Sequence, residues 1–426
     1  MKLWQKGAAA HQKVDHFTVG KDREYDLQLA AYDCEASMAH AQMLAKIGLL
    51  TTEEAATLVE VLTELKQAAQ EDRFTIEAEH EDMHSKIEHI LTERLGDLGK
   101  KIHTARSRND QVLVAMHLYL KEELKAIKTQ VVALFDVLLA LAEKHQAELI
   151  PGYTHLQVAM PSSIGLWLSA YAESLIDDLH FWQSAYAIAD QNPLGSAAGY
   201  GSAFPIDREF TTEVLGFEQL KVNAVAAQMS RGKLEKSTAM AFASIGSTLA
   251  KLSMDVCLYM GQDFNFISFP DELTTGSSIM PHKKNPDLLE LVRGKCNALQ
   301  ALPNQLALLT TNLPSGYHRE LQLAKGPIIE GVQEIKACLD ILLFSLPNLQ
   351  VNKAITDHKK YDYLFSVDTL NAEVLAGKPF RDAYRDLGNA IEAGEYTPNR
   401  NLQHTHLGSI GNLGLENIRA KMTPLR

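Results

Sequence analysis

The sequence predicts an all-α protein, and three observations support this prediction. From Lys100 to Ile150 the chain contains neither glycine nor proline. Further segments free of both residues cover 166–192, 233–245 and 247–260. Strict alternation of apolar and polar residues, which indicates a half-buried strand, is scarce throughout the chain. Long helices joined by short loops are therefore the expected architecture.

The segment 100–150 predicts one very long amphipathic helix. Its apolar residues recur at steps of three and four, which places them on one helical stripe: Leu113, Met116, Leu120, Leu124, Ile127, Val131, Leu134, Leu138 and Leu141. An average helix has about 11–12 residues. We therefore expect this helix to belong to a bundle that extends beyond the core of one subunit.

Breaker residues suggest how the chain is divided. Loops are expected at Pro151-Gly152, at 192–195, at Phe204-Pro205, at Pro270 and at 275–287. The predicted domains are a helical N-terminal domain over 1–103, a central long-helix bundle over 104–346 that carries most site motifs, and a small C-terminal helical domain over 347–426. A chain of 426 residues is long enough for this number of domains.

Composition excludes several classes of function. The net charge is −12, from 41 basic and 53 acidic side chains, which argues against nucleic acid or an anionic membrane as the main partner. The N-terminal MKLWQKGAAAHQK lacks the apolar core of a signal peptide, and no uninterrupted apolar run could span a bilayer. Four cysteines lie far apart without a CxxC pair, so a zinc or disulfide framework is not expected. These features fit a cytoplasmic enzyme with reduced thiols.

Two polar motifs flank the predicted long helix. In IHTARSRNDQ, residues 102–111, one interpretation is a helix start capped by Ser107, Asn109 or Asp110. The other is an anion site at a helix N-terminus, and composition alone slightly favours the cap. In PGYTHLQ, residues 151–157, a lone histidine is more often structural than catalytic. The glycine-rich segment 194–201 has the wrong spacing for a dinucleotide site and predicts a tight loop.

The stretch TGSSIMPHKKNPD, residues 275–287, is the most unusual loop. Gly276, Ser277 and Ser278 form a flexible segment rich in donors, and Lys283 and Asn285 precede Pro286, a favoured first helical residue. Ammonium, amide and helix dipole would together hold a carboxylate whose negative charge grows during a reaction. A mobile surface loop capped by Asn285 explains the glycine and prolines but not the lysines beside the hydroxyls.

Other polar groups give weaker signals. In YHRELQLAK, residues 317–325, Gln322 and Lys325 share a face if the segment is helical, although a solvated face is equally typical. Histidines 80, 84, 89, 404 and 406 have no metal-ligand spacing and are interpreted as structural or surface residues.

Together these motifs identify a resemblance. GSSIMPHKKNP resembles the signature of the fumarase/aspartase superfamily, and HTARSRNDQV, PGYTHLQ and YHRELQLAK narrow the resemblance to the argininosuccinate lyase family. EDMHSKIEHIL and GKPFRDAYRDLG extend it over nearly the whole chain. The family's reaction splits argininosuccinate into arginine and fumarate and uses neither cofactor nor metal.

The resemblance implies a role for each matching residue. Ser277 would take the proton next to a carboxylate, and Lys283 and Asn285 would hold that carboxylate. His155 would protonate the leaving nitrogen or orient the water that does so, and Glu290 would pair with it. Fumarate-side carboxylates would be bound by Ser107, Arg108, Asn109 and Thr154. The rest of the substrate would be bound by Tyr317, Gln322 and Lys325.

The resemblance also implies an assembly, a homotetramer. Long helices of four subunits would form a twenty-helix core, and each active site would draw on three subunits. This would give a purpose to the break-free segment 100–150. It would also let His155, Ser277 and the Arg108 region cooperate without being neighbours in one chain.

Several positions depart from the family pattern. Val158 and Met160 stand where Arg and Gln are usual, and a usual Arg is missing near Gln228, with Arg231 nearly one turn away. The family's serine in the N-terminal binding loop corresponds to Asp22, with Asp26 matching its partner, and Ala105 replaces a common glycine. Each departure bears on substrate recognition, and none removes a proton-transfer residue. They leave open an N-acylated argininosuccinate as substrate.

Two further interpretations remain. One is another fumarate-releasing lyase, similar to adenylosuccinate lyase. The other is a catalytically silent relative similar to the lens crystallins of this family, which the intact Ser277, Lys283, Asn285 and His155 disfavour.

Overall fold

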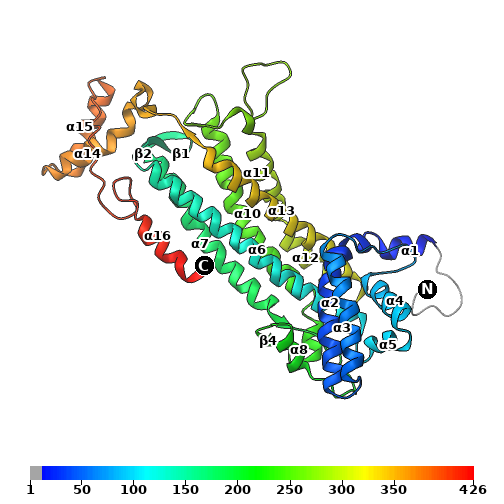
Figure 1. Cartoon of the computed structure of the whole chain (residues 1–426). Helices are drawn as coiled ribbons and strands as arrows, with labels where there is room; N and C mark the ends of the chain where they lie inside the picture. The colour runs from blue at the N-terminus through cyan, green and yellow to red at the C-terminus, as the bar shows by residue number, and fades with distance from the viewer. Residues whose placement is uncertain (1–11) are drawn as a thin grey trace. The chain divides into compact units, whose positions relative to one another are not determined.

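The computed structural model describes residues 12–426, and this part is mostly helical, which confirms the all-α prediction. Eleven residues of the stretch MKLWQKGAAAHQK lie outside the described residues. The α-helices, labelled in Figure 1 where there is room, are α1 (Gln12–Val19), α2 (Asp22–Lys46), α3 (Thr52–Gln70), α4 (Met83–Leu95), α5 (Asp97–Lys100), α6 (Arg108–Lys144), α7 (Ile164–Ala189), α8 (Arg208–Val214), α9 (Ala224–Gln228), α10 (Lys233–Met260), α11 (Asp287–Leu299), α12 (Leu302–Leu309), α13 (Lys325–Ser345), α14 (Ser366–Leu375), α15 (Phe380–Glu392) and α16 (Leu415–Met422).

Short strands complete the described part in three pairs. β1 (Leu149–Thr154) pairs antiparallel with β2 (Gln157–Ser163), and β5 (Ile267–Ser268) pairs antiparallel with β6 (Gln350–Val351). β3 (Gln191–Asn192) pairs parallel with β4 (Gln219–Leu220).

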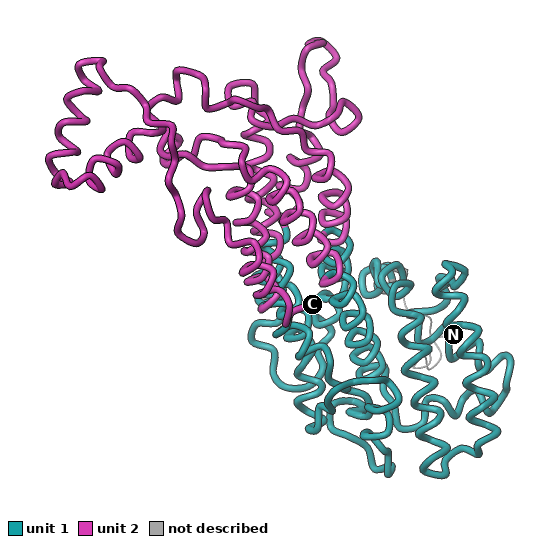
Figure 2. The backbone as a smooth tube through the Cα atoms, turned by 60° about the vertical axis from the view of Figure 1, so that its left-hand side comes forward, with its two compact units in different colours: residues 1–127, 181–243, 299–334 teal, residues 128–180, 244–298, 335–426 magenta. Residues whose placement is uncertain are grey.

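The chain divides into two compact units, coloured separately in Figure 2. Unit 1 comprises residues 1–127, 181–243 and 299–334, and unit 2 comprises 128–180, 244–298 and 335–426. Each unit is thus built from three separate segments of the chain. The division into domains at 103 and 346 stays a prediction.

The predicted long helix is α6, which runs without a break from Arg108 to Lys144. All nine residues of the predicted stripe, from Leu113 to Leu141, are buried, most of them completely. Periodicity therefore identified both the helix and its buried face correctly. A helix of this length is stabilised chiefly by packing of that apolar face.

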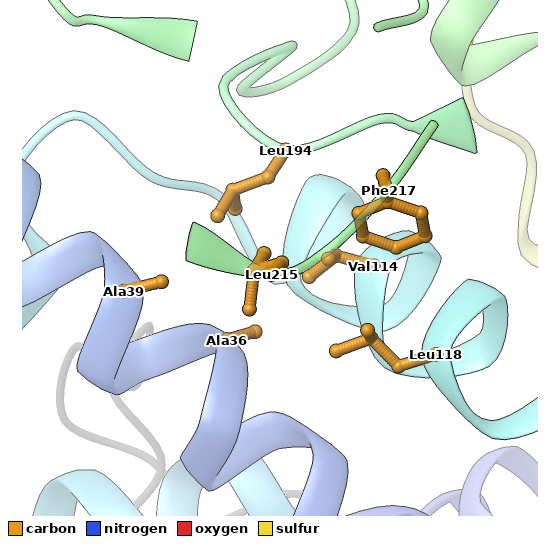
Figure 3. Packing of buried hydrophobic residues seen from close by; sticks show 7 residues of the cluster. All are labelled: Ala36, Ala39, Val114, Leu118, Leu194, Leu215 and Phe217. Carbon is orange, nitrogen blue, oxygen red and sulfur yellow. The ribbon is translucent and has the colours of Figure 1, made fainter. Parts of the chain in front are cut away.

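The core of unit 1 includes a cluster of buried apolar side chains (Figure 3). Ala36 and Ala39 come from α2, Val114 and Leu118 from α6, and Leu194, Leu215 and Phe217 from the segments that follow α7 and α8. Small alanines on α2 leave room for the larger side chains around them. This packing holds the first turns of α6, which carry predicted site residues, against the N-terminal helices.

A second face of α2 buries polar side chains. Asp26, Asp33, Ser37 and His40 all have an exposed fraction of 1%. Ser37 Oγ accepts a hydrogen bond from Arg106 (2.8 Å), and His40 Nε2 donates to the carbonyl of Thr104 (2.8 Å). Because buried polar groups need partners, α2 fixes the chain that leads into α6.

One loop prediction of the sequence differs from the structure. Pro151-Gly152 does not form a loop but lies inside β1, where the register with β2 shifts between Pro151 and Tyr153. Proline has no backbone N–H to donate, and at such an irregularity of the strand pairing none is required, so Pro151 is tolerated. The glycine at 246 does not end a helix, since α10 continues through it. A Cβ at this position would lie 3.1 Å from the carbonyl oxygen of Cys296, so glycine permits a close approach of α11.

One described helix, α10, is long and apolar enough to cross a membrane by length and composition alone, although 56% of its most apolar window is buried within the protein. Such burial is typical of a core helix in a soluble protein.

Candidate active site

Unit 1 contains a small polar pocket of about 150 Å³. Five predicted site residues line it: Arg108, Asn109, Tyr317, Gln322 and Lys325. The remaining wall consists of residues outside that predicted set: Asp22, Asp26, Glu81, Asp82, His84, Val112, Arg231 and Arg319. Side chains far apart in the sequence thus meet in one pocket. A larger cavity of unit 1, about 600 Å³, contains none of the predicted site residues.

The first side of this pocket is the N-terminus of α6. Ser107 caps the helix, because its Oγ accepts the amide N–H of Asn109 (2.9 Å). Its own N–H donates to Oδ1 of Asp110 (3.0 Å), which completes a reciprocal cap. The cap interpretation of residues 102–111 is therefore correct, and it leaves the Ser107 hydroxyl proton and the helix N-terminus available to an anion.

Asp110 also fixes the glycine-rich loop. Its Oδ2 accepts the amide N–H groups of Gly195 and Ala197, both at 3.0 Å. Burial raises the pKa of this carboxyl, and the donated backbone hydrogen bonds oppose that rise. The segment 194–201 is a sequence of turns, as predicted, and Asp110 ties it to the start of α6.

Arg108 lies in a cradle of carboxylates. Its Nη1 is 3.1 Å from Glu81 and 3.2 Å from Asp82, while its buried Nη2 has no hydrogen-bond partner among residues 12–426. Asp82 is itself the cap of α4, accepting the amide N–H of Ser85 (2.8 Å). This unpartnered nitrogen of a partly buried guanidinium gives the pocket one donor for an incoming anion.

A buried ion pair supports the floor of the pocket. His84 Nδ1 lies 3.0 Å from Oδ1 of Asp33, and the side chains are 3% and 1% exposed. Burial alone would lower the pKa of His84, but the carboxylates of Asp33, Asp82 and Asp26 outweigh it and raise that pKa. The sequence interpretation of His84 as structural did not foresee this pairing. Its only signal was the family resemblance of EDMHSKIEHIL.

The segment 317–325 forms the second side of the pocket. Residues 319–324 form a 3-10 helix that leads into α13 at Lys325. Gln322 and Lys325 converge on Asp22, at 2.6 Å each, so the expectation of a shared face is correct. The guanidinium of Arg231 lies 5.7 Å from the centre of the Tyr317 ring, a cation–π distance. Arg231 therefore lines this pocket, in a chain that lacks the family's usual arginine near Gln228.

In unit 2, His155 is presented at the tip of the β1–β2 hairpin. Thr154 pairs with Gln157, so His155 and Leu156 form a two-residue loop with φ of 53° and 56°. Such loops favour Asn-Gly, and residues with a branched or bulky side chain are strained there. Below the tip, Tyr153 packs edge-on against Phe264 (5.4 Å between ring centres) and anchors the hairpin.

The loop 275–287 of unit 2 is closed at its base. The N–H of Asn285 donates to the carbonyl of Thr275 (2.8 Å), and the N–H of Thr275 donates back (3.2 Å). Within the loop, Ser277 Oγ accepts the amide N–H of Met280 (3.2 Å) and more weakly that of Ile279 (3.4 Å). Hydrogen bonds donated to an oxygen favour its anionic form, which is the form a serine base requires.

Two details of this loop differ from the expected helix start. Helix α11 begins at Asp287, and the carbonyl of Pro286 accepts the amide N–H of Glu290 (3.0 Å). The Asn285 side chain does not cap the helix but donates to the carbonyl of Gly276 (3.5 Å). Asn285 pairs with Thr275 in an isolated β-bridge, so the backbone there is extended. Helix α11 therefore begins one residue later than the sequence predicted.

Within the described chain, no side-chain hydrogen bond or ion pair joins the predicted residues of unit 2 to one another. His155 and Lys283 are exposed, and neither has a side-chain hydrogen bond or ion pair with any residue of 12–426. Glu290 lies 3.9 Å from Arg293 and not beside His155. The pairing of Glu290 with His155 therefore stays a prediction about subunits of an assembly.

Comparison with known proteins gives a consistent result. A family model described as lyase matches residues 9–300. The chain is 53% identical over 421 residues to an argininosuccinate lyase of Parabacteroides distasonis, covering 99% of this chain and 94% of that one. It is 41% identical over 384 residues to an argininosuccinate lyase of Thermotoga neapolitana, covering 90% and 96%.

Solved structures show the same fold. An EDDS lyase in complex with formate has a TM-score of 0.79 at 22% identity, covering 98% of this chain and 91% of that one. A class II fumarase from Schistosoma mansoni has a TM-score of 0.71 at 17% identity, covering 93% and 94%.

Proposed function

This chain belongs to the argininosuccinate lyase family, and we propose that it catalyses the reversible β-elimination of argininosuccinate to arginine and fumarate. The observation that carries the proposal is 53% identity to an argininosuccinate lyase over 99% of the chain. The geometry of the pocket in unit 1 and of the loop 275–287 agrees with such a reaction.

The first step is proton abstraction by Ser277. Its Oγ, as the alkoxide, takes the proton from the carbon next to a carboxylate, and negative charge moves onto that carboxylate. Lys283 and Asn285 hold the resulting dianion. The amide N–H groups of Ile279 and Met280 that point at Ser277 Oγ support this role, because they stabilise an alkoxide.

The second step breaks the C–N bond. The electron pair of the carbanion forms the double bond of fumarate, and the guanidino nitrogen leaves with the bond pair. His155, or a water that it orients, supplies the proton that the leaving nitrogen needs. Glu290 of another subunit pairs with the imidazole and keeps it protonated.

Binding groups complete the site. Ser107, Arg108, Asn109 and Thr154 hold the fumarate-side carboxylates, and Tyr317, Gln322 and Lys325 hold the arginine half. We further propose a homotetramer in which each active site draws on three subunits, working in the cytoplasm in arginine biosynthesis. Exposed His155 and Lys283 support this arrangement, since both would gain partners in an assembly.

The direct test is fumarate release, followed by ultraviolet absorbance, with argininosuccinate and adenylosuccinate supplied separately. Release from argininosuccinate alone is expected. Release only from adenylosuccinate would replace the proposed substrate, and release from neither would refute the enzymatic function.

The roles of Ser277 and His155 have separate tests. Ser277→Ala should lower kcat by about 10²–10⁴-fold while Ser278→Ala, which removes the neighbouring exposed hydroxyl, should change it little. His155→Asn keeps a residue that tolerates positive φ, so a comparable loss would reflect chemistry and not hairpin distortion. Full turnover in Ser277→Ala would remove Ser277 from the base role.

The shared site is tested by mixing subunits. Ser277→Ala and His155→Asn subunits, refolded together, should regain part of the activity that each lacks, because hybrid tetramers contain sites with both intact residues. A light-scattering mass of one chain, or no recovery in verified hybrids, would argue against sites shared between subunits.

A further inference from the structure

Asp22 binds two of the side chains that are proposed to bind substrate, Gln322 and Lys325. Its Oδ2 accepts a hydrogen bond from Gln322 Nε2 (2.6 Å), and its Oδ1 lies 2.6 Å from Lys325 Nζ. Both partners line the same pocket in unit 1. A carboxylate of the protein thus sits where a carboxylate of the substrate would be held.

Asp26, one turn further along α2, is bound differently. Its Oδ1 lies 2.5 Å from Lys325 Nζ, and its Oδ2 accepts the amide N–H of Met83 (3.0 Å). The Asp26 side chain is 1% exposed, whereas that of Asp22 is 13% exposed. Asp26 is therefore fixed by the backbone of α4, and Asp22 is the carboxylate whose partners a ligand can take.

The charges around these two residues leave one carboxylate short of a cation. Glu81 and Asp82 are matched by Arg108 and Arg319. Asp22 and Asp26 share the single ammonium of Lys325, since the nearby His84 is paired with Asp33. Arg231 acts on Asp22 from a distance, but it also acts on the buried carboxyl of Glu235.

The protonation tendencies agree with this count. Burial is the largest influence on Asp22 and raises its pKa, the neighbouring Asp26 raises it further, and Lys325 opposes both. Burial would lower the pKa of Lys325, but Asp26 and Asp22 outweigh it and raise that pKa. The ammonium stays charged, and the excess negative charge resides on the carboxylate pair.

We propose that Asp22 makes this site selective for a substrate with a free α-ammonium group. This inference rests on the proposed function. The α-carboxylate of the arginine half displaces Asp22 from Gln322 and Lys325, and the α-ammonium beside it becomes the new partner of Asp22. After this exchange Asp22 again has a counter-charge of its own, and Lys325 is shared by Asp26 and the α-carboxylate.

An N-acylated substrate cannot complete the exchange. Its α-carboxylate competes for Gln322 and Lys325 equally well, but its amide nitrogen carries no positive charge. Asp22 would be left largely buried with neither its lysine nor a ligand cation, which is costly for a carboxylate. The serine usual in the family carries no charge, so an aspartate makes rejection of the acylated form stronger.

The experiment compares argininosuccinate with Nα-acetylargininosuccinate as substrates for fumarate release. In the natural protein, kcat/KM should favour the free amine by about 100-fold or more, because the acetylated substrate leaves the largely buried carboxylate of Asp22 without a counter-charge. Asp22→Ser and the isosteric Asp22→Asn should each reduce this ratio by about 10-fold or more. In both variants KM for argininosuccinate should rise, while kcat/KM for the acetylated substrate should increase.

The matched control is Glu24→Gln, which removes a carboxylate from the exposed side of the same helical turn and should leave the ratio unchanged. Inhibition of the natural protein by arginine and by Nα-acetylarginine gives a second measurement that needs no variant. Arginine should bind at least about 10-fold more tightly.

Three outcomes overturn the inference. The first is equal kcat/KM for the two substrates in the natural protein. The second is an equal loss of kcat/KM for both substrates in Asp22→Ser, which would make Asp22 only a support for Lys325. The third is equal inhibition by arginine and Nα-acetylarginine. If neither substrate releases fumarate, the proposed function fails, which is distinguishable from an unchanged ratio in an active enzyme.

Discussion

Asp110 offers the sharpest test of how the site is held together. It is completely buried, and its two oxygens accept three backbone N–H groups, from Ser107, Gly195 and Ala197, all at 3.0 Å. Substitution by alanine removes all three acceptors without offering a replacement. Substitution by asparagine keeps one acceptor oxygen but places an NH₂ donor beside the backbone N–H donors.

The magnitude follows from these contacts. Each buried donor left without a partner costs about 1–3 kcal/mol, so three would cost about 3–9 kcal/mol. Because Ser107 is only half-buried and water can reach it, we expect Asp110→Ala to lower the free energy of unfolding by about 3–5 kcal/mol, the lower part of that range. Burial raises the pKa of Asp110, which means that the folded protein disfavours its charge. Asp110→Asn relieves that cost and retains one acceptor, so its loss should be about 1–2 kcal/mol.

Urea denaturation at fixed protein concentration measures both losses, because an oligomer's stability depends on concentration. Asp97→Ala, at a side chain that is 93% exposed, is the control and should cost less than about 0.5 kcal/mol. KM should rise in both Asp110 variants, since Ser107 and Asn109 lose their support. A loss below about 1 kcal/mol in Asp110→Ala, or a larger loss in Asp110→Asn, would refute this reasoning.

Three further predictions concern backbone strain and buried histidines. Ala105 has φ of 62°, so Ala105→Gly should raise the free energy of unfolding by about 0.5–1 kcal/mol in the same urea assay, and a decrease would contradict the strain. Neighbouring carboxylates raise the pKa of His84, so its stabilisation is present below the ordinary value of 6.5 and is lost as pH rises through the folded pKa. His84→Gln should flatten the fall of stability over that window, and an unchanged slope would exclude His84 as its source. Burial lowers the pKa of His117 to about 3, so stability linked to it is lost as pH falls from 6.5 toward 3. Its imidazole resonances should not shift above about pH 4 in an NMR titration, and a midpoint near 6.5 would show it to be solvated.

Features written locally in the sequence were predicted well. The stripe from Leu113 to Leu141 identified α6, because apolar periodicity directly reflects which side of a helix is buried. Ser107 was among the expected caps for a similar reason, since the residue types that cap helices act within one turn.

Features that depend on tertiary contacts were missed. The hairpin strand through Pro151-Gly152 and the unbroken α10 at Gly246 both depend on neighbours that no local pattern reveals. The pairing of His84 with Asp33 joins two helices, and neither residue has a distinctive sequence environment. Motif resemblance pointed to Lys325 as a binding residue, which stays a prediction, and its double use by Asp22 and Asp26 became evident only from geometry.

The bridge between Thr275 and Asn285 also limits how this loop can move. With both ends fastened by backbone hydrogen bonds, only the short stretch between them, which carries Ser277 and Lys283, is free to change position. Loop movements in enzymes commonly take microseconds to milliseconds, and enzymes typically turn over about 1–10³ times per second. A movement of this stretch that had to break the ion pair between Lys284 and Asp271 would therefore fall within the time of one catalytic cycle.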